Sequence, residues 1–369
     1  METWKISEWQ AMGYLVMIVF ATSILFVPGL VAKGAGMASW LALVIALAVG
    51  SLIALVSTSL GLRYPEKTII EYAVDILGFP LGKLVSLLFI FYFIYVAYYV
   101  LRQFQALMSA AYMPETPPVV FMALLTLLSC AALYLGLEVI VRANSLILFF
   151  NLLAIFIIFF VFLGTVDWFN LKPDFSKGIG PIVNGSLSPS SWFGETAVIL
   201  MLIPFIQRKS AVRRVTLYAI LLLFFLLELV IIAVVGHYGP DRTSRLVFPL
   251  FTLLSQPPHF VQELFFQPSA LFMAVWISGM LMKLTTFFFA GVYGLAQWFG
   301  LASYRCLVLP AGALIVVLAF ISWPNTEKLL EFSQYTFPLS ILFINLGLPL
   351  FLYLISLFRH GLNYTKGAS

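Results

Sequence analysis

Long apolar runs separated by short polar stretches divide most of this chain. A helix needs about 20 mostly apolar residues to cross a bilayer, and ten runs approach or exceed that length. The pattern therefore predicts ten transmembrane helices, at 9–31, 37–61, 82–112, 118–137, 144–167, 184–207, 215–238, 268–299, 305–323 and 334–358.

Two shorter stretches lie between these spans. An amphipathic segment ends near Asp75 and is predicted to lie along the inner membrane surface. The apolar run from Leu246 to Leu254 is bounded by Pro240 and Pro257. It is too short to cross the membrane, so an interfacial helix is expected.

Composition agrees with this pattern. Of 369 residues, 62% are hydrophobic and 9% are charged, which excludes a soluble protein and indicates an all-α polytopic membrane protein. The net charge of +5 comes from scattered basic residues that form no stripe, so no nucleic-acid partner is expected. The two cysteines define no disulfide framework. We find no nucleophile–base arrangement, metal-ligand spacing or phosphate loop, so an enzyme is the weakest interpretation and no cofactor or metal is predicted.

Lysine and arginine are more frequent in the loops that lie on the same side of the membrane as the N-terminus in the predicted topology. This bias predicts that both termini are cytoplasmic. Ten spans split into two halves of five, 1–167 and 184–358, within one membrane domain. An odd number of spans per half gives the halves opposite orientations, so a shared fold would make them an inverted repeat.

The first span contains the cluster Thr22-Ser23 followed by Pro28-Gly29. Pro28 removes the donor for the carbonyl of residue 24. Non-helical backbone within a membrane survives only inside protein or beside a wet cavity, so a break here would mark a ligand site. The alternative is a proline kink in which serine and threonine satisfy their own turn.

Span six, which corresponds to span one in a repeat, carries Gly194-Glu195 and then Pro204. Helical rise places both interruptions about 20 Å from the inner surface. Two interrupted helices at matching positions indicate a substrate site at the membrane midplane. Both spans are therefore predicted to break there. The exposed helix ends would offer N–H groups for a carboxylate and carbonyl groups for an ammonium, as a zwitterionic amino acid requires.

Several short motifs resemble the spore-germination permeases, the B subunits of nutrient germinant receptors in endospore-forming bacteria. They are Lys5-Ile6-Ser7 with Gln10, Ile24-Leu25-Phe26-Val27-Pro28, Ala35-Gly36-Met37-Ala38-Ser39-Trp40, and Gly194-Glu195 before Pro204. The resemblance implies the five-plus-five inverted-repeat fold of the amino acid–polyamine–organocation superfamily. It also implies a small germinant, typically an amino acid. The implied partners are a larger A-type membrane subunit and a C-type lipoprotein in the inner membrane of the spore.

Two intramembrane charges are the sharpest candidates for function. Glu195 could bind a ligand ammonium, carry a proton or pair with Lys283, and the alternative is a protonated, internally hydrogen-bonded side chain. The resemblance places Lys283 beside span one and suggests a fixed ammonium where sodium binds in relatives, which argues against sodium coupling. Snorkelling of Lys283 to the inner face is the alternative. Glu228 is a second candidate proton carrier, or the donor of an internal hydrogen bond.

Other polar residues receive lesser roles. Tyr92, Tyr95 and Tyr99 share one helical stripe, and the resemblance implies that a tyrosine there walls the pocket, with simple packing as the alternative. Asn151 is predicted to form an interhelical hydrogen bond, and Arg102 to snorkel outward. The predicted substrate-binding set is Thr22, Ser23, Ile24, Leu25, Phe26, Pro28, Tyr95, Tyr99, Gly194, Glu195, Thr285 and Thr286.

The sequence leaves three alternative functions for this protein. The first is a germinant-sensing receptor subunit that binds a small germinant, a neutral amino acid, on a transporter fold. The second is an autonomous proton-coupled amino-acid permease that uses Glu195 or Glu228. The third is a conduit subunit that passes ions or water without a ligand of its own.

Overall fold

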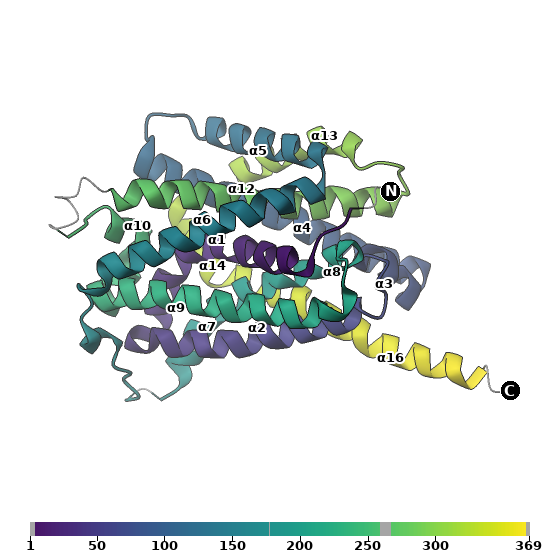
Figure 1. Ribbon diagram of the computed structural model, residues 1–369, viewed down its shortest axis with the longest axis horizontal. Coiled ribbons are helices and arrows are strands. Elements are labelled where there is room, and N and C mark those ends of the chain that lie inside the picture. The colour runs from purple at the N-terminus through teal and green to yellow at the C-terminus, as the bar shows by residue number, and fades with distance from the viewer. Residues whose placement is uncertain (1–3, 177, 259–266, 367–369) are drawn as a thin grey trace.

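The computed structural model describes residues 4–176, 178–258 and 267–366, with side chains up to Phe358. Its helices run along one common direction and form a bundle (Figure 1). Eight helical segments of the described chain are long and apolar enough to cross a membrane, and the first of them, Glu8–Gly61, contains two helices. The prediction of an all-α polytopic membrane protein is confirmed. The exact count of ten spans stays a prediction.

The long helices of the bundle are α1 (Glu8–Ala35), α2 (Ser39–Gly61), α4 (Phe79–Leu107), α5 (Pro118–Leu135), α6 (Leu137–Leu163), α9 (Val212–Arg245), α12 (Pro268–Phe299), α13 (Arg305–Ser322) and α16 (Leu348–Lys366). The shorter α-helices are α3 (Ile69–Leu77), α7 (Gly180–Gly194), α8 (Ile199–Leu202), α10 (Pro249–Leu254), α14 (Thr326–Gln334) and α15 (Thr336–Leu342). Tighter or wider turns join them: η1 (Gly36–Ala38), η2 (Met108–Tyr112), η3 (Trp168–Leu171), η4 (Glu195–Val198), η5 (Ile203–Phe205), η6 (Lys209–Ala211) and η7 (Phe343–Gly347).

Helix α1 is the centre of the bundle. It packs against α9, α7, α12 and α6, and almost all of its side chains are buried. A helix that is apolar on every side belongs in such an interior position. Its start is fixed by a capping box: the Ser7 hydroxyl accepts from the Gln10 N–H at 3.1 Å, and the Ser7 N–H donates to the Gln10 side chain at 2.9 Å. The Ser7 and Gln10 pair of the N-terminal motif therefore defines where α1 begins.

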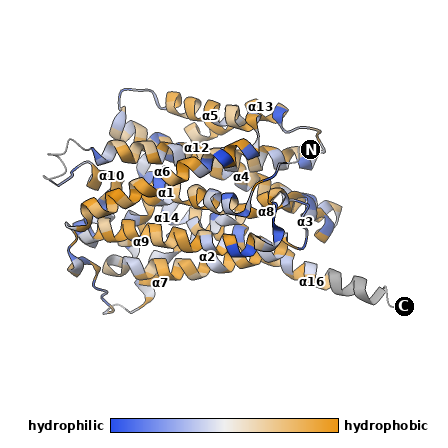
Figure 2. Ribbon diagram, viewed as in Figure 1, coloured by the Kyte–Doolittle hydropathy of each residue, from blue (hydrophilic) through white to orange (hydrophobic). Residues whose placement is uncertain are grey.

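The outer helices present apolar side chains outward. Exposed examples are Leu127 on α5, Phe149 and Phe160 on α6, and Phe320 on α13. Hydrophobic residues cover most helix surfaces, and hydrophilic residues gather chiefly toward the ends of the bundle (Figure 2). Such a surface suits lipid rather than water. The start of α1 and the end of α16 lie at the same end of the bundle (Figure 1), which agrees with both termini on one side.

The first span does not break. Residues of α1 form one continuous α-helix that includes Pro28. The Ser23 hydroxyl donates to the carbonyls of Val19 at 2.9 Å and Phe20 at 3.3 Å, so it bonds within its own turn. The predicted interruption of span one is therefore wrong. Proline removes a single helical hydrogen bond, and the dense packing around α1 keeps the flanking turns helical.

The α-helix of the sixth span is interrupted at the predicted residues, where the backbone passes into 3₁₀ geometry without leaving the right-handed helical region. Helix α7 ends at Gly194, the 3₁₀ turn η4 follows, and only the single turn of α8 separates it from η5, which contains Pro204. The ammonium of Lys209 caps the end of this segment by donating to the carbonyls of Ile203 at 2.6 Å and Pro204 at 2.7 Å. Carbonyls at a helix end lack intrahelical partners, and Lys209 supplies one.

The two short apolar segments both pack on the bundle. Helix α3 begins with a capping box between Thr68 and Glu71, and its buried side packs against α4. Helix α10 buries Leu250, Leu253 and Leu254 against α1, α9 and α12. It lies at the end of the bundle away from the two termini (Figure 1). Their positions relative to a membrane surface stay predictions.

Candidate ligand site

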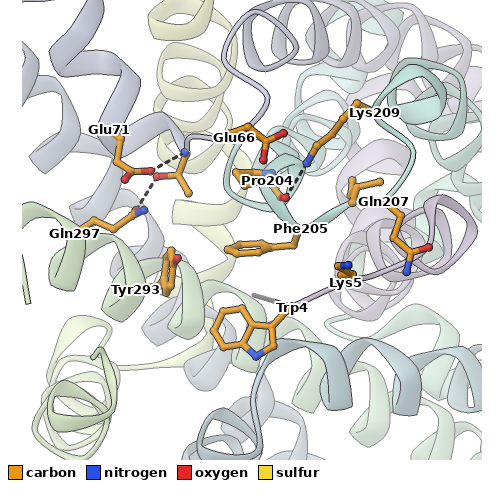
Figure 3. A pocket seen from close by; sticks show the side chains of 12 residues that line it. Trp4, Lys5, Glu66, Glu71, Pro204, Phe205, Gln207, Lys209, Tyr293 and Gln297 are labelled. Carbon is orange, nitrogen blue, oxygen red and sulfur yellow. Dashed lines mark hydrogen bonds between the residues drawn. The ribbon is translucent and has the colours of Figure 1, made fainter. Parts of the chain in front are cut away.

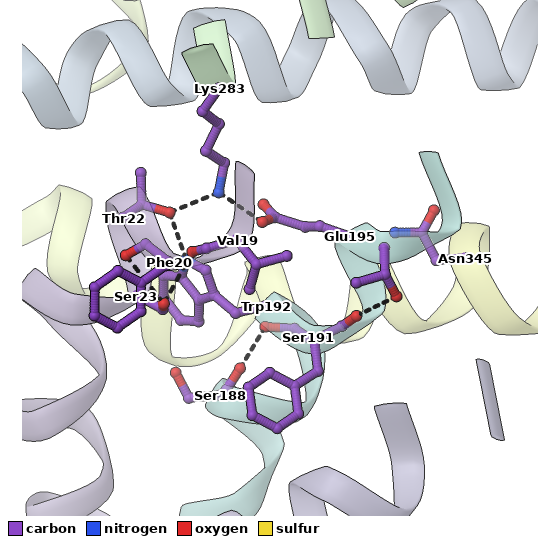
Figure 4. Close-up of polar contacts among 12 residues, drawn as sticks. Val19, Phe20, Thr22, Ser23, Ser188, Ser191, Trp192, Glu195, Lys283 and Asn345 are labelled. Carbon is purple, nitrogen blue, oxygen red and sulfur yellow. Dashed lines mark hydrogen bonds and ion pairs between the residues drawn. The ribbon is translucent and has the colours of Figure 1, made fainter. Parts of the chain in front are cut away.

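An ion pair joins three of the central helical segments (Figure 4). The Lys283 ammonium on α12 donates to Oε2 of Glu195 at 2.5 Å and to Oγ1 of Thr22 on α1 at 2.6 Å. The indole N–H of Trp192 on α7 donates to the same Thr22 oxygen at 2.8 Å. The side chains of Lys283 and Glu195 are 0% exposed, so the pair is completely enclosed by protein.

The break in span six positions the carboxylate. Glu195 is the first residue of η4, directly after α7 ends at Gly194. Gly194 packs closely against α2, because a Cβ there would lie 3.1 Å from Cδ1 of Ile53. A larger residue would push the break away from α2, so glycine permits the position of Glu195 that reaches α12.

The pair is not fully satisfied. Oε1 of Glu195 is buried and has no hydrogen-bond partner among the described residues. Removing two charges from water is costly, and an unused buried acceptor adds to that cost. The site therefore has an unmet capacity to accept a hydrogen bond from a donor or a cation.

Two tyrosines of α4 lie next to this pair. The Glu195 carboxylate interacts electrostatically with the hydroxyl groups of Tyr92 and Tyr99. Tyr92 accepts from the Asn345 amide at 2.8 Å, and Asn345 is drawn beside Glu195 in Figure 4. Tyr99 shares a 2.6 Å hydrogen bond with Ser333. Tyr99 and Tyr92 thus lie near Glu195, and the role of a tyrosine as a wall of the ligand pocket stays a prediction.

Tyr95 has a packing role. Its ring contacts Tyr98 and Phe332, with centroids 5.6 Å and 6.0 Å apart. Phe332 belongs to α14. The packing alternative is the better description of Tyr95.

The two threonines predicted to accompany Lys283 bond to other partners. The Thr285 hydroxyl donates to Ser129 of α5 at 3.1 Å. Thr286 forms a 2.5 Å hydrogen bond with Tyr14 of α1. Successive residues of a helix point in different directions, so these side chains cannot all face the space that Lys283 occupies. Thr22 takes the place that Thr285 and Thr286 were expected to fill.

The remaining α1 candidates surround the site without a polar contact to it. Ile24, Leu25 and Pro28 are buried in packing, as Ser23 is by its own turn. Phe26 packs edge to face against Phe248 with centroids 5.8 Å apart. These residues pack α1 against its neighbours, and their contact with a ligand stays a prediction.

Three other intramembrane polar residues lie apart from the Lys283 pair. Glu228 on α9 is partly exposed, and its Oε1 has no hydrogen-bond partner among the described residues. Asn151 forms the predicted interhelical hydrogen bond, donating to the Val275 carbonyl at 3.2 Å. Arg102 does not snorkel: it is 8% exposed and donates to the Trp323 carbonyl at 2.9 Å. The carbonyl at the end of α13 holds this guanidinium inside the protein.

Two polar residues described below are not among the site residues predicted from the sequence. Trp192 holds Thr22 in place, and Gln103 is 0% exposed with both amide atoms unpartnered among the described residues. Gln103 follows Tyr99 by four residues and so lies on the same stripe of α4. Its signal in the sequence is a polar amide within a long apolar run.

A cavity lies toward each end of the bundle. The larger, about 760 Å³, lies at the end that holds the N-terminal segment and is lined by Trp4, Glu66, Phe205 and Gln297 among others (Figure 3). The N-terminal segment closes against the end of span six, because the Ile6 N–H donates to the Phe205 carbonyl at 2.9 Å. The smaller cavity, about 320 Å³, lies at the other end.

The fold is that of a membrane transporter. A solved structure titled as MhsT in complex with L-phenylalanine matches with a TM-score of 0.67 and 14% identity, covering 94% of this chain and 90% of that one. A Na⁺-coupled sialic acid symporter matches with a TM-score of 0.65 and 11% identity, covering 92% and 79%. At such identities the likeness concerns the fold alone.

The family is narrower than the fold. The family model described as "Spore germination protein" matches residues 5–328, and the chain belongs to this family of spore germination permeases. Spore germination protein KB of Bacillus subtilis (strain 168) is 29% identical over 365 residues, covering 97% of this chain and 96% of that protein. The putative spore germination protein YfkT of the same strain is 24% identical over 353 residues, covering 95% and 96%.

Proposed function

We propose that this protein is the membrane subunit of a spore nutrient-germinant receptor that binds a small neutral amino acid and signals germination. The ligand lies between α1 and the break in span six. The observation that carries this proposal is the enclosed carboxylate of Glu195, which has one oxygen on Lys283 and the other unpartnered.

The chemistry of the site suits an ammonium group. The unpartnered oxygen of Glu195 accepts a hydrogen bond from it. Helix α7 ends at Gly194, and the carbonyl end of a helix carries partial negative charge that favours a cation. The unpartnered amide of Gln103, on the tyrosine stripe, offers a donor to a ligand carboxylate. The site thus provides both kinds of partner that a zwitterion needs.

Lys283 takes the role of a resident cation. Its ammonium already neutralises Glu195 and holds α12 to α1 through Thr22. A fixed ammonium between α1 and α12 leaves no use for a sodium ion in the same place, so ligand binding is independent of sodium. Any signal then requires that the ligand favour one conformation of the bundle over another.

The family supports the setting of this function. The proposed setting is the spore inner membrane, with both termini cytoplasmic, and the names of the relatives as spore germination proteins support it. An A-type membrane subunit and a C-type lipoprotein are the proposed partners, and they receive the conformational signal.

An autonomous proton-coupled amino-acid permease is the second candidate. The transporter fold and the unpartnered carboxylate oxygen of Glu228 on α9 favour it. Uptake of an amino acid by the lone chain in proteoliposomes, driven by a pH gradient and lost in Glu228→Gln, would establish it. Conductance or water flux that needs no amino acid would instead indicate a conduit subunit.

Thermal stability of the purified protein tests the main proposal. A ligand that binds the folded state raises the transition temperature by mass action, so a panel of amino acids, nucleosides and sugars is screened. We expect a shift with a small neutral amino acid that is lost in Glu195→Gln and kept in Glu228→Gln, the matched control. An equal shift in Glu195→Gln would remove the site from Glu195.

A further inference from the structure

The smaller cavity lies directly beyond the Lys283 site. It is bounded by α1, by the segment between α9 and α10, and by α14. Phe26 lines it, and Phe26 follows Thr22 by four residues, which is one helical turn along α1. The ring of Phe26 also packs edge to face against Phe248.

The floor of the cavity is apolar and its walls carry opposite charges. Leu30 and Leu330 line the floor with Phe26. Lys33 stands on the α1 side, and Glu327 and Glu331 stand on the α14 side. Gly29, part of the Pro28-Gly29 motif, lets α1 approach the start of α10, since a Cβ there would lie 3.3 Å from Cγ of Pro249.

The charged groups face one another and keep capacity to bind. The hydrogen bond from Lys328 lowers the pKa of the Glu331 carboxyl, and the Lys33 charge across the cavity lowers it further, so Glu331 is ionised at neutral pH. The Lys33 ammonium donates one hydrogen bond, to the Gln334 side chain at 2.8 Å, out of the three it can make. The cavity therefore presents an ammonium and carboxylates above an apolar floor.

We propose that this cavity is a second ligand site, which holds a zwitterionic amino acid with an apolar side chain. The ligand carboxylate binds Lys33, its ammonium binds Glu327 and Glu331, and its side chain packs on Phe26, Leu30 and Leu330. The volume of about 320 Å³ lies within the range of roughly 300–1,000 Å³ typical of small-molecule sites. The site is separate from Glu195, so it stands whether or not the buried pair binds a ligand.

Equilibrium dialysis of radiolabelled leucine against the full chain in detergent tests the proposal. We expect two leucine molecules per wild-type chain and one per Glu195→Gln chain. In either background, Lys33→Met and Glu331→Gln should weaken the outer molecule's binding by about tenfold or more, since each removes a charge-assisted hydrogen bond. Lys172→Met and Glu115→Gln change exposed charges that do not line the cavity, and they should leave both molecules bound.

Competitors define the ligand class. N-acetylleucine lacks the ammonium and leucinamide lacks the carboxylate, so neither should displace the outer leucine. Displacement by phosphoethanolamine would mean that the cavity holds a lipid headgroup instead, and it would overturn the proposal. Leucine bound to the wild-type chain in a number that neither Lys33→Met nor Glu331→Gln reduces would overturn it as well. If Lys33→Met removes one leucine while Glu195→Gln removes none, the outer site stands and the function proposed for Glu195 fails.

Discussion

Lys283 and Glu195 are 88 residues apart in the chain, and their side chains meet at 2.5 Å inside the bundle. The same ammonium lies 2.6 Å from Thr22, so one cation connects α1, α12 and the break in span six. Each of these segments moves only if the others accommodate it. The pair is therefore both the centre of the proposed ligand site and a connection that restricts the relative movement of these three segments.

Substituting one residue of the Lys283–Glu195 pair should leave its buried partner unpaired, whereas substituting both residues should not. Lys283→Met and Glu195→Gln each leave a buried partner unpaired and should lower the free energy of unfolding by about 3–5 kcal/mol. The double variant leaves no unpaired charge, so it should be more stable than the sum of the two single losses predicts. Denaturant unfolding in detergent measures the four proteins. Additive losses would show that the two side chains do not interact.

Thr22 should be sensitive to loss of its oxygen and tolerant of loss of its methyl group. Thr22→Val removes the acceptor for both Lys283 and Trp192 and leaves their donors buried, which should cost about 1–3 kcal/mol. Thr22→Ser keeps the hydroxyl and serves as the matched control. Thermal unfolding of the two variants checks this, and equal losses would mean that packing, not hydrogen bonding, determines the role of Thr22.

Position 194 should not accommodate a β-branched side chain, because there is too little space between it and α2. Gly194→Val places atoms against Cδ1 of Ile53 and should destabilise the protein by about 1–3 kcal/mol. Ile53→Val removes that methyl group and should restore part of the loss. Gly164→Val is the control, because a Cβ at Gly164 meets no atom within 4 Å. A loss at Gly194 that Ile53→Val leaves unchanged would count against the steric explanation.

Lys209 should hold the end of span six in place. Lys209→Met removes the donor to the carbonyls of Ile203 and Pro204 and should speed amide hydrogen exchange in the segment that follows η5, including Gln207. The substitution should leave exchange within α1 unchanged. Lys209→Arg retains a donor and provides the comparison. Identical exchange in the Met and Arg variants would show that the cap has no effect on this segment.

Most of the helical framework could be predicted from the hydrophobic pattern. A single apolar run that crosses a bilayer satisfies its backbone hydrogen bonds within itself by forming a helix. The ends of these runs therefore agree with the ends of the helices to within a few residues in most cases. Glycine and proline at Gly194 and Pro204 correctly indicated a break. The same kind of signal at Pro28 was misleading, since a proline costs a helix one hydrogen bond and the neighbours of α1 decide whether the helix continues.

The site required the assembled bundle. The sequence showed that Glu195 and Lys283 lie at membrane depth, where an unpaired charge is expensive, and their pairing was one of several alternatives. Which partners they have depends on how α1, α12 and the end of α7 rotate about their own axes, and packing between helices sets that rotation. For this reason Thr22 bonds to Lys283, Thr285 bonds to Ser129 and Thr286 bonds to Tyr14. Periodicity along one chain segment specifies which residues share a face, and only contact with other segments specifies what that face meets.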